Sequence, residues 1–268
     1  MIQIGNKQFS LQNHTYIMGI LNVTPDSFSD GGTYNSVDAA LFRAEHMLTE
    51  GCDIIDIGGE STRPGFTEIS VKEECERVVP VIRAIKERFD VPISLDTYKY
   101  EVAKEGILSG ADMINDIWGL KYDNGEMAKV ISEYKVACCL MHNRANAQYQ
   151  AFLQDVLQDL KATIQIAQEA GIASDKIVLD PGIGFAKTYE QNLEILRNLE
   201  VFKELGYPML LGASRKSVIG LTLDLPKEER EEGTLVTTVK AVEAGYRFVR
   251  VHDCEKNKRA IQMAEAIR

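Results

Sequence analysis

Residues 51–57 read GCDIIDI, a glycine and a short link followed by an apolar run that carries an aspartate. Glycine just past a helix can take the left-handed conformation that closes the helix. A nearly continuous apolar run is what a strand needs when both faces of its sheet are covered. The same order of glycine, link and apolar run returns at residues 110–115, 171–180, 206–211 and 245–251. The sequence therefore predicts a repeated unit in which a helix leads into a buried parallel strand.

Apolar runs of this kind predict about eight strands, and a helical pattern follows each of them. The expected strands cover residues 15–21, 53–57, 91–95, 112–115, 135–141, 176–180, 207–211 and 246–251. Eight alternating units in 268 residues predict an α/β fold, a (β/α)8 TIM barrel in a single domain over residues 1–268. A doubly wound open sheet is the alternative. Residues 1–14 precede the first unit and are expected to form a short N-terminal extension, either a hairpin or a cap.

The helical segments carry their own signals. Apolar residues recur at helical spacing over residues 37–50 and again over residues 155–170, which predicts amphipathic helices with one buried face. Ser70 with Glu73, and Thr188 with Gln191, fit the pattern in which a hydroxyl caps the first turn of a helix and the acid or amide three residues later bonds back.

Composition excludes several classes of protein. Forty acidic residues stand against thirty basic ones, and no dense Lys/Arg block is present, so a nucleic-acid partner is not expected. No apolar run is long enough to span a membrane, and the N-terminus lacks the pattern of a secretory signal. Five cysteines without a CxxC pair indicate reduced, mostly buried thiols. The expected location is the cytoplasm.

Polar residues stand at or just past the end of each expected strand. They are Asn22, Asp56, Asp96, Asn115, His142, Asp180, Lys216, Arg250 and His252. In a parallel barrel the active site gathers at this end of the strands, so we expect the set to surround one pocket. Residues 22–32 and 58–65 add two loops rich in glycine and hydroxyl side chains, which suit a phosphate-bearing ligand.

Two of these segments closely resemble the signatures of the dihydropteroate synthases. They are residues 18–32, MGILNVTPDSFSDGG, and residues 58–65, GGESTRPG. Shorter matches follow in the family order at residues 96–97, 115–116, 180–187, 212–217 and 250–253. The resemblance covers nearly the whole chain. One departure lies after the fifth expected strand, where residues 141–146 read MHNRAN in place of the Met-His, Met-Arg-Gly pattern of many members.

The resemblance implies a pterin-binding barrel that joins 6-hydroxymethyl-7,8-dihydropterin pyrophosphate to 4-aminobenzoate, giving dihydropteroate and pyrophosphate in folate biosynthesis. It also implies a Mg2+ cofactor, a homodimer, and competition by sulfonamides, which imitate aminobenzoate. Two alternatives remain: a pterin-binding corrinoid methyltransferase, which has no use for a pyrophosphate site, and a non-catalytic pterin-binding paralogue.

The resemblance also implies roles for individual residues. The pterin would be held by Asp96, Asn115, Asp180 and Lys216. The pyrophosphate would be held by Asn22, Thr62, Arg63, Arg250 and His252, with Asn22 also a ligand of the metal. Pro64, Phe185 and Ser214 would line the aminobenzoate slot. The residues expected to act in catalysis are Arg63, Lys216, Arg250 and His252.

The chemistry of these side chains favours a dissociative order. Cationic side chains and a metal ion stabilise a departing pyrophosphate, whereas no dedicated base is evident beside the expected amine. An aromatic amine is neutral at pH 7 and attacks without prior deprotonation. We therefore expect pyrophosphate to leave first and aminobenzoate to attack the resulting cation.

Overall fold

A computed structural model describes residues 1–24, 33–60 and 68–268 of the chain. These residues contain one eight-stranded parallel sheet, in the order β8-β7-β6-β5-β4-β3-β10-β9. The strands are β3 (Tyr16–Asn22), β4 (Ile54–Gly58), β5 (Ile93–Asp96), β6 (Met113–Asp116), β7 (Ala137–Met141), β8 (Ile177–Asp180), β9 (Leu210–Leu211) and β10 (Phe248–Val251). The ring closes where Leu179 pairs in parallel with Met209 and donates its N–H to the Pro208 carbonyl at 3.0 Å. This closure confirms the predicted barrel over the open sheet.

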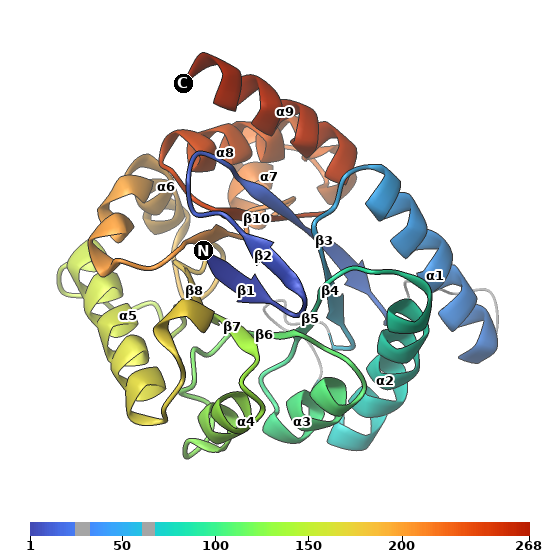
Figure 1. The fold of residues 1–268 in the computed structure, drawn as a ribbon. Helices are drawn as coiled ribbons and strands as arrows, with labels where there is room; N and C mark the ends of the chain where they lie inside the picture. The colour runs from blue at the N-terminus through green and yellow to red at the C-terminus, as the bar shows by residue number, and fades with distance from the viewer. Residues whose placement is uncertain (25–32, 61–67) are drawn as a thin grey trace.

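Helices surround the barrel, as Figure 1 shows along its axis. They are α1 (Thr33–Thr49), α2 (Val71–Arg88), α3 (Tyr100–Leu108), α4 (Glu126–Tyr134), α5 (Phe152–Glu169), α6 (Tyr189–Arg197), α7 (Ser217–Leu223), α8 (Glu231–Glu243) and α9 (Cys254–Ile267). Short 3-10 turns occupy Ser174–Lys176, Leu199–Leu205 and Lys227–Glu229. The predicted reciprocal cap is confirmed at Thr188 and Gln191. At Ser70 the hydroxyl accepts from the Glu73 N–H as predicted, but the Glu73 carboxylate accepts from Arg77 at 2.6 Å.

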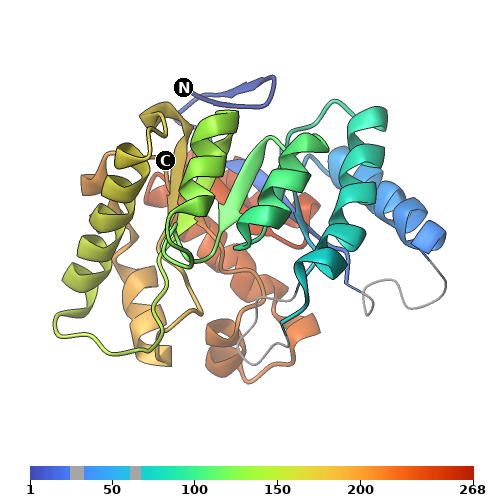
Figure 2. The same cartoon turned by 90° about the horizontal axis from the view of Figure 1, so that it is seen from below.

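The N-terminal extension closes one end of the barrel. Strands β1 (Ile2–Ile4) and β2 (Lys7–Phe9) pair antiparallel, which confirms the expected hairpin. The buried side chains of Ile2, Ile4 and Phe9 pack against barrel residues such as Met18 and Phe248. Figure 2 shows the hairpin across one end of the barrel. The hairpin leaves the opposite end of the barrel, at the carboxyl ends of the strands, as the place for the predicted site.

Strand boundaries depart from the prediction where the backbone lacks a hydrogen-bond donor. The seventh strand was expected over residues 207–211, but β9 covers only Leu210–Leu211. Pro208 has no N–H to give to a ladder, although its carbonyl accepts from the Leu179 N–H. Pro92 shortens the start of β5 for the same reason.

The five cysteines agree with the prediction of reduced, mostly buried thiols. Cys52, Cys138, Cys139 and Cys254 are buried, Cys75 is partly buried, and all five are free thiols. Burial raises the pKa of Cys138 and Cys139 well above the ordinary range, so both stay protonated as small apolar side chains.

Candidate active site

The predicted site residues that the structure describes all lie at or just past the carboxyl ends of the strands. They are Asn22, Asp96, Asn115, Asp180, Phe185, Ser214, Lys216, Arg250 and His252. Register places Asn22, Gly58, Asp96 and Asn115 side by side across four neighbouring strands. Thr62, Arg63 and Pro64 lie outside the described residues, so their positions stay predictions.

Arg250 lies between two carboxylates inside the mouth of the barrel. Its Nε donates to Asp56 Oδ2 and its Nη2 to Asp96 Oδ2, both at 2.6 Å. Asn115 Nδ2 donates to the same Asp56 oxygen at 3.3 Å. The Asp56 and Asp96 side chains are 0% and 7% exposed. Asp56 had been noted at a strand end without a role, and the structure makes it the partner of Arg250.

Each of these carboxylates keeps one oxygen for another partner. Asp56 Oδ1 and Asp96 Oδ1 are buried without a hydrogen-bond partner among the described residues. Burial raises the pKa of Asp96 to about 7, against the opposing effect of Arg250 and with the Asp56 charge adding to the rise. Burial disfavours the Arg250 cation, but Asp56 and Asp96 more than compensate and raise its pKa, so the guanidinium stays charged. A ligand with adjacent N–H donors can satisfy the unpaired oxygens.

Lys216 and Asp180 form the other half of the pocket. Lys216 Nζ donates to the Ile183 carbonyl at 2.5 Å and lies 4.7 Å from the centre of the Phe185 ring. A β-carbon at Gly212 would lie 3.2 Å from Asp180 Oδ2 and 3.9 Å from Lys216 Nζ, so both side chains approach the backbone of Gly212 closely. Burial lowers the pKa of Lys216 to about 8, although Asp180 opposes the shift. Lys216 can therefore donate a hydrogen bond and exchange a proton near neutral pH.

Ser214 and His252 are joined at the rim. Ser214 Oγ lies 2.8 Å from His252 Nδ1, and the His252 backbone N–H donates to the same hydroxyl at 3.3 Å. The Ser214 hydroxyl therefore contacts both the backbone and the ring of His252. The residues predicted to bind aminobenzoate and pyrophosphate are thus in direct contact here.

Aromatic and apolar side chains provide a wall for a flat ligand. Tyr98, Ile117 and Met141 form a small buried cluster, against which Trp118 and Phe185 pack. Trp118, which follows the end of β6, is partly buried against this cluster.

A buried ionic cluster that the sequence did not suggest includes Glu60, the last described residue of the second signature. Lys99 Nζ donates to Glu60, to Glu74 Oε2 at 2.9 Å and to the Ile69 carbonyl at 2.7 Å. Tyr98 Oη donates to Glu60 Oε1 at 2.9 Å. Glu60 lies within the second signature and Ile69 follows it, so Lys99 joins the chain before residue 61 to the chain after residue 67. No spacing rule links Lys99 to these two glutamates.

The comparisons with known proteins agree with this geometry. A family model described as "Pterin binding enzyme" matches residues 18–252. The dihydropteroate synthase of Clostridium beijerinckii is 58% identical, with 99% of each chain covered, and that of Bacillus subtilis is 53% identical, with 96% of this chain and 90% of the relative covered. The chain belongs to the dihydropteroate synthases.

Solved structures of this family superpose closely on the chain. A dihydropteroate synthase from Clostridium difficile, solved in the presence of pteroic acid, has a TM-score of 0.93 at 48% identity and covers 100% of this chain and 99% of its own. The Xanthomonas albilineans enzyme with 4-aminobenzoic acid has a TM-score of 0.90 at 39% identity, and the match covers 96% of this chain and 94% of that one. The Yersinia pestis enzyme in a sulfonamide drug complex has a TM-score of 0.93 at 39% identity, and the match covers 99% of this chain and 98% of that one.

The raised pKa of Asp96 predicts how stability responds to pH. A carboxyl group whose pKa is higher in the fold than in the unfolded chain stabilises the fold most when protonated, so its contribution is lost as pH rises from about 4 through about 7. The free energy of unfolding of wild type should therefore fall relative to Asp96→Asn by up to about 4 kcal/mol across this range. Urea unfolding of both proteins at intervals between pH 5 and 8 measures the difference. Parallel pH profiles would show that Asp96 ionises at its ordinary pKa.

Proposed function

We propose that the chain condenses 6-hydroxymethyl-7,8-dihydropterin pyrophosphate with 4-aminobenzoate, releasing 7,8-dihydropteroate and pyrophosphate. The observation that carries the proposal is a cluster of side chains: buried carboxylates with unpaired oxygens, next to the cations Arg250 and Lys216, at the carboxyl ends of the strands of a barrel from this family. Such a cluster suits a ligand that has N–H groups at one end and phosphate oxygens at the other.

The pterin ring would lie against Asp96, Asn115, Asp180 and Lys216. Its amide-like edge and exocyclic amine need acceptors, and Asp96 Oδ1 is a buried oxygen without a partner among the described residues. Asp180 Oδ1 accepts from the Gly182 N–H at 2.7 Å, which orients the carboxylate and leaves Oδ2 directed toward Gly212 and Lys216. Lys216 donates to a ring nitrogen or carbonyl.

The pyrophosphate would be bound by Asn22, Thr62, Arg63, Arg250 and His252. Arg250 uses only two of its five N–H groups on Asp56 and Asp96, so others remain for a phosphate oxygen. Catalysis is proposed to rest on Arg63, Lys216, Arg250 and His252, which stabilise the negative charge that grows on the leaving group. The ring of His252 is held in place by Ser214.

Mg2+ is proposed to bind together with the substrate. No group of three or more His, Cys, Asp or Glu side chains suited to a metal is present in the described parts of the chain. The donor chemistry still fits, because Mg2+ commonly takes one or two protein oxygens and completes its shell with water and substrate phosphates. Asn22 Oδ1 would be the protein ligand. When bound, the metal would supply positive charge to the leaving pyrophosphate.

The second substrate, 4-aminobenzoate, would lie in a slot lined by Pro64, Phe185 and Ser214, where sulfonamides compete. Phe185 packs on the aromatic wall and covers Lys216. We propose a dissociative order, in which pyrophosphate departs before the neutral amine attacks the pterin methylene. Positional isotope exchange in the bound pterin pyrophosphate, measured without aminobenzoate, would support this order, and its absence would favour a concerted displacement.

We also propose a homodimer formed through helices α7, α8 and α9. These neighbouring helices carry large exposed apolar side chains: Leu221 (66% exposed), Leu223 (44%), Val236 (64%), Met263 (62%) and Ile267 (71%). A run of such residues over adjacent helices is typical of a subunit interface.

One pterin-binding domain over residues 1–268 in the cytoplasm is the organisation we propose. Residues 1–14 serve as its cap, packed by the hairpin against the barrel. Among the described residues, no helix combines the length and apolar character needed to cross a bilayer. Fractionation of the cells that produce the protein tests the location.

Asp180→Ala tests the proposed activity. Wild type should release pyrophosphate when pterin pyrophosphate, aminobenzoate and Mg2+ are all present. The variant should lose a charged hydrogen-bond acceptor and bind the pterin about 10–100-fold more weakly, with its fold retained. Asp175→Ala, an exposed aspartate just before β8, is the matched control and should behave as wild type. Pterin affinity unchanged by Asp180→Ala would remove Asp180 from the pterin site, and an inactive wild type would refute the activity.

Val236→Asp tests the proposed dimer. A carboxylate at the centre of an apolar interface costs several kcal/mol when unpaired, so the variant should sediment as a monomer where wild type is a dimer. Leu108→Asp on α3, where the native side chain is 58% exposed, should leave the dimer intact. A dimeric Val236→Asp variant would place the interface elsewhere.

A further inference from the structure

The segment that follows β8, residues 181–186, has a strained backbone conformation. Gly182, Gly184 and Ala186 have φ values of +74°, +82° and +45°, so left-handed residues alternate with ordinary ones. This conformation is costly for an alanine, and such strain persists only where the surroundings impose it. The segment carries Phe185, which packs on the aromatic wall of the site.

Side chains from outside the segment hold its carbonyl groups. Lys187 Nζ donates to the carbonyls of Gly182 and Phe185 at 2.9 and 3.0 Å. Tyr149 Oη donates to the Ala186 carbonyl at 2.8 Å. Lys216 Nζ donates to the Ile183 carbonyl from the other side. Lys187 therefore bridges the two carbonyls that flank the turn, and Lys216 contacts the one within it.

His142 holds the ammonium group of Lys187 in position. Its Nδ1 lies 2.9 Å from Lys187 Nζ, and its Nε2 lies 3.0 Å from Asp159 Oδ2. Burial lowers the pKa of His142 to about 4, so the ring is neutral. Asp159 also accepts from Arg144 Nε at 2.6 Å and, despite its partial burial, His142 and Arg144 hold its pKa well below the usual range. An ionised Asp159 requires Nε2–H, which leaves Nδ1 as the acceptor for Lys187.

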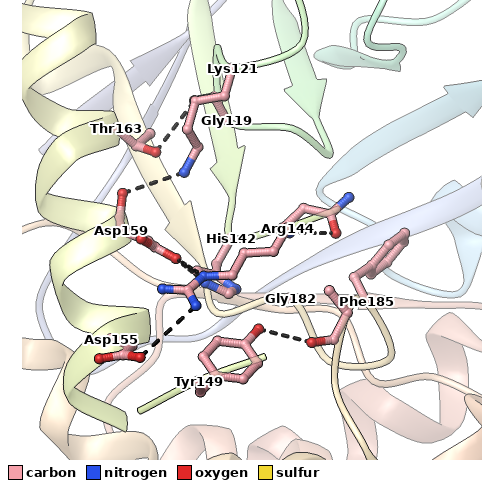
Figure 3. A network of polar contacts seen from close by, with 12 residues as sticks. Gly119, Lys121, His142, Arg144, Tyr149, Asp155, Asp159, Thr163, Gly182 and Phe185 are labelled. Atoms are coloured by element: carbon pink, nitrogen blue, oxygen red, sulfur yellow. Dashed lines mark hydrogen bonds and ion pairs between the residues drawn. The ribbon is translucent and has the colours of Figure 1, made fainter. Parts of the chain in front are cut away.

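The segment 143–146, which departs from the family pattern, completes this arrangement. Arg144 reaches Asp159 on α5, and its guanidinium lies 4.4 Å from the centre of the Tyr149 ring. Figure 3 shows His142, Arg144 and Tyr149 gathered beside Asp159, with Tyr149 pointing toward the segment that carries Phe185. The departure thus supplies Arg144, which contacts both Asp159 and the Tyr149 ring and so supports the side chains that hold this segment.

We propose that Lys187 is a positioning residue for the second substrate, tying the carbonyls of Gly182 and Phe185 to His142 and so holding Phe185 over Lys216. All three donors of its ammonium group are used, on His142 Nδ1 and the two carbonyls. Lys187 does not touch the reacting atoms. It acts through Phe185, which is 4.7 Å from Lys216 Nζ, and this role rests on the function proposed above.

The proposal separates the two substrates. Asp96 and Asn115 lie on other strands, whereas Asp180 and Lys216 contact the segment at Gly182 and Ile183. Pterin binding should therefore depend on Lys187 less than aminobenzoate binding does, since Phe185 would line the aminobenzoate slot. A purely structural lysine would affect both substrates equally.

The test is steady-state kinetics of Lys187→Met with each substrate varied in turn, together with thermal unfolding. Methionine keeps the length of the stem and removes all three donors. We expect the KM for aminobenzoate to rise about 10–100-fold, because small displacements of a positioning group cost that much. The KM for pterin pyrophosphate should rise by a clearly smaller factor, and the melting temperature should fall because His142 Nδ1 and the two carbonyls lose their donor. Lys121→Met is the matched control, since among the described residues the side chain of this exposed lysine bonds only to the Asp159 carbonyl, at 3.5 Å, and the variant should leave both KM values unchanged.

Tyr149→Phe supplies a second test that depends less on folding. It removes one hydroxyl from the same segment and should raise the KM for aminobenzoate about fivefold. An unchanged aminobenzoate KM in both variants would overturn the proposal, as would equal losses for both substrates. If Lys187→Met does not fold, Tyr149→Phe decides by the same criterion. A wild type without pyrophosphate release would refute the proposed function itself, whereas an active wild type with an unaffected Lys187→Met refutes only this role.

Discussion

The guanidinium of Arg250 between Asp56 and Asp96 is the interaction on which the mouth of the barrel depends. It joins β10 to β4 and β5 and lets two buried carboxylates share one cation. A buried ion pair of this kind contributes little to net stability, because desolvation offsets the attraction. Its value is chemical. Without Arg250, two acids would face each other at the place where an anionic substrate has to bind, and one of them would stay protonated.

The remaining groups divide the work around this centre. Lys216 lies between Asp180 and Phe185, where burial keeps its pKa near neutral pH and its donor faces the pocket. Lys187 directly follows the same segment and donates its hydrogen bonds to the carbonyls of Gly182 and Phe185. The two lysines therefore differ in role although they bracket one short stretch of chain. Lys99 acts in a similar way, because its buried ammonium group holds Glu60 and the Ile69 carbonyl as Lys187 holds the carbonyls around Phe185.

Sequence patterns predicted most of the fold and the identity of the residues at the strand ends. Glycine-punctuated apolar runs gave the barrel, and only the strand next to Pro208 was much shorter than expected. The pairings within the site were beyond sequence reasoning: Arg250 and Asp56 are 194 residues apart, and His142 and Lys187 are 45 apart. Such contacts depend on barrel register and side-chain rotamers, which local patterns do not encode. One sequence signal could have been used: Asp56 is a charged residue with isoleucines on both sides in an apolar run, and in the structure that strand is buried along its whole length.

The most direct test of the account is a crystal structure of the chain with pterin pyrophosphate bound. The ring should lie at the carboxyl ends of the strands with its N–H groups within hydrogen-bond distance of Asp96 and Asp180. Arg250 should still bridge Asp56 and Asp96 while one of its free N–H groups meets a phosphate oxygen. A pterin bound elsewhere, or an Arg250 that leaves both carboxylates when the ligand binds, would contradict the central claim.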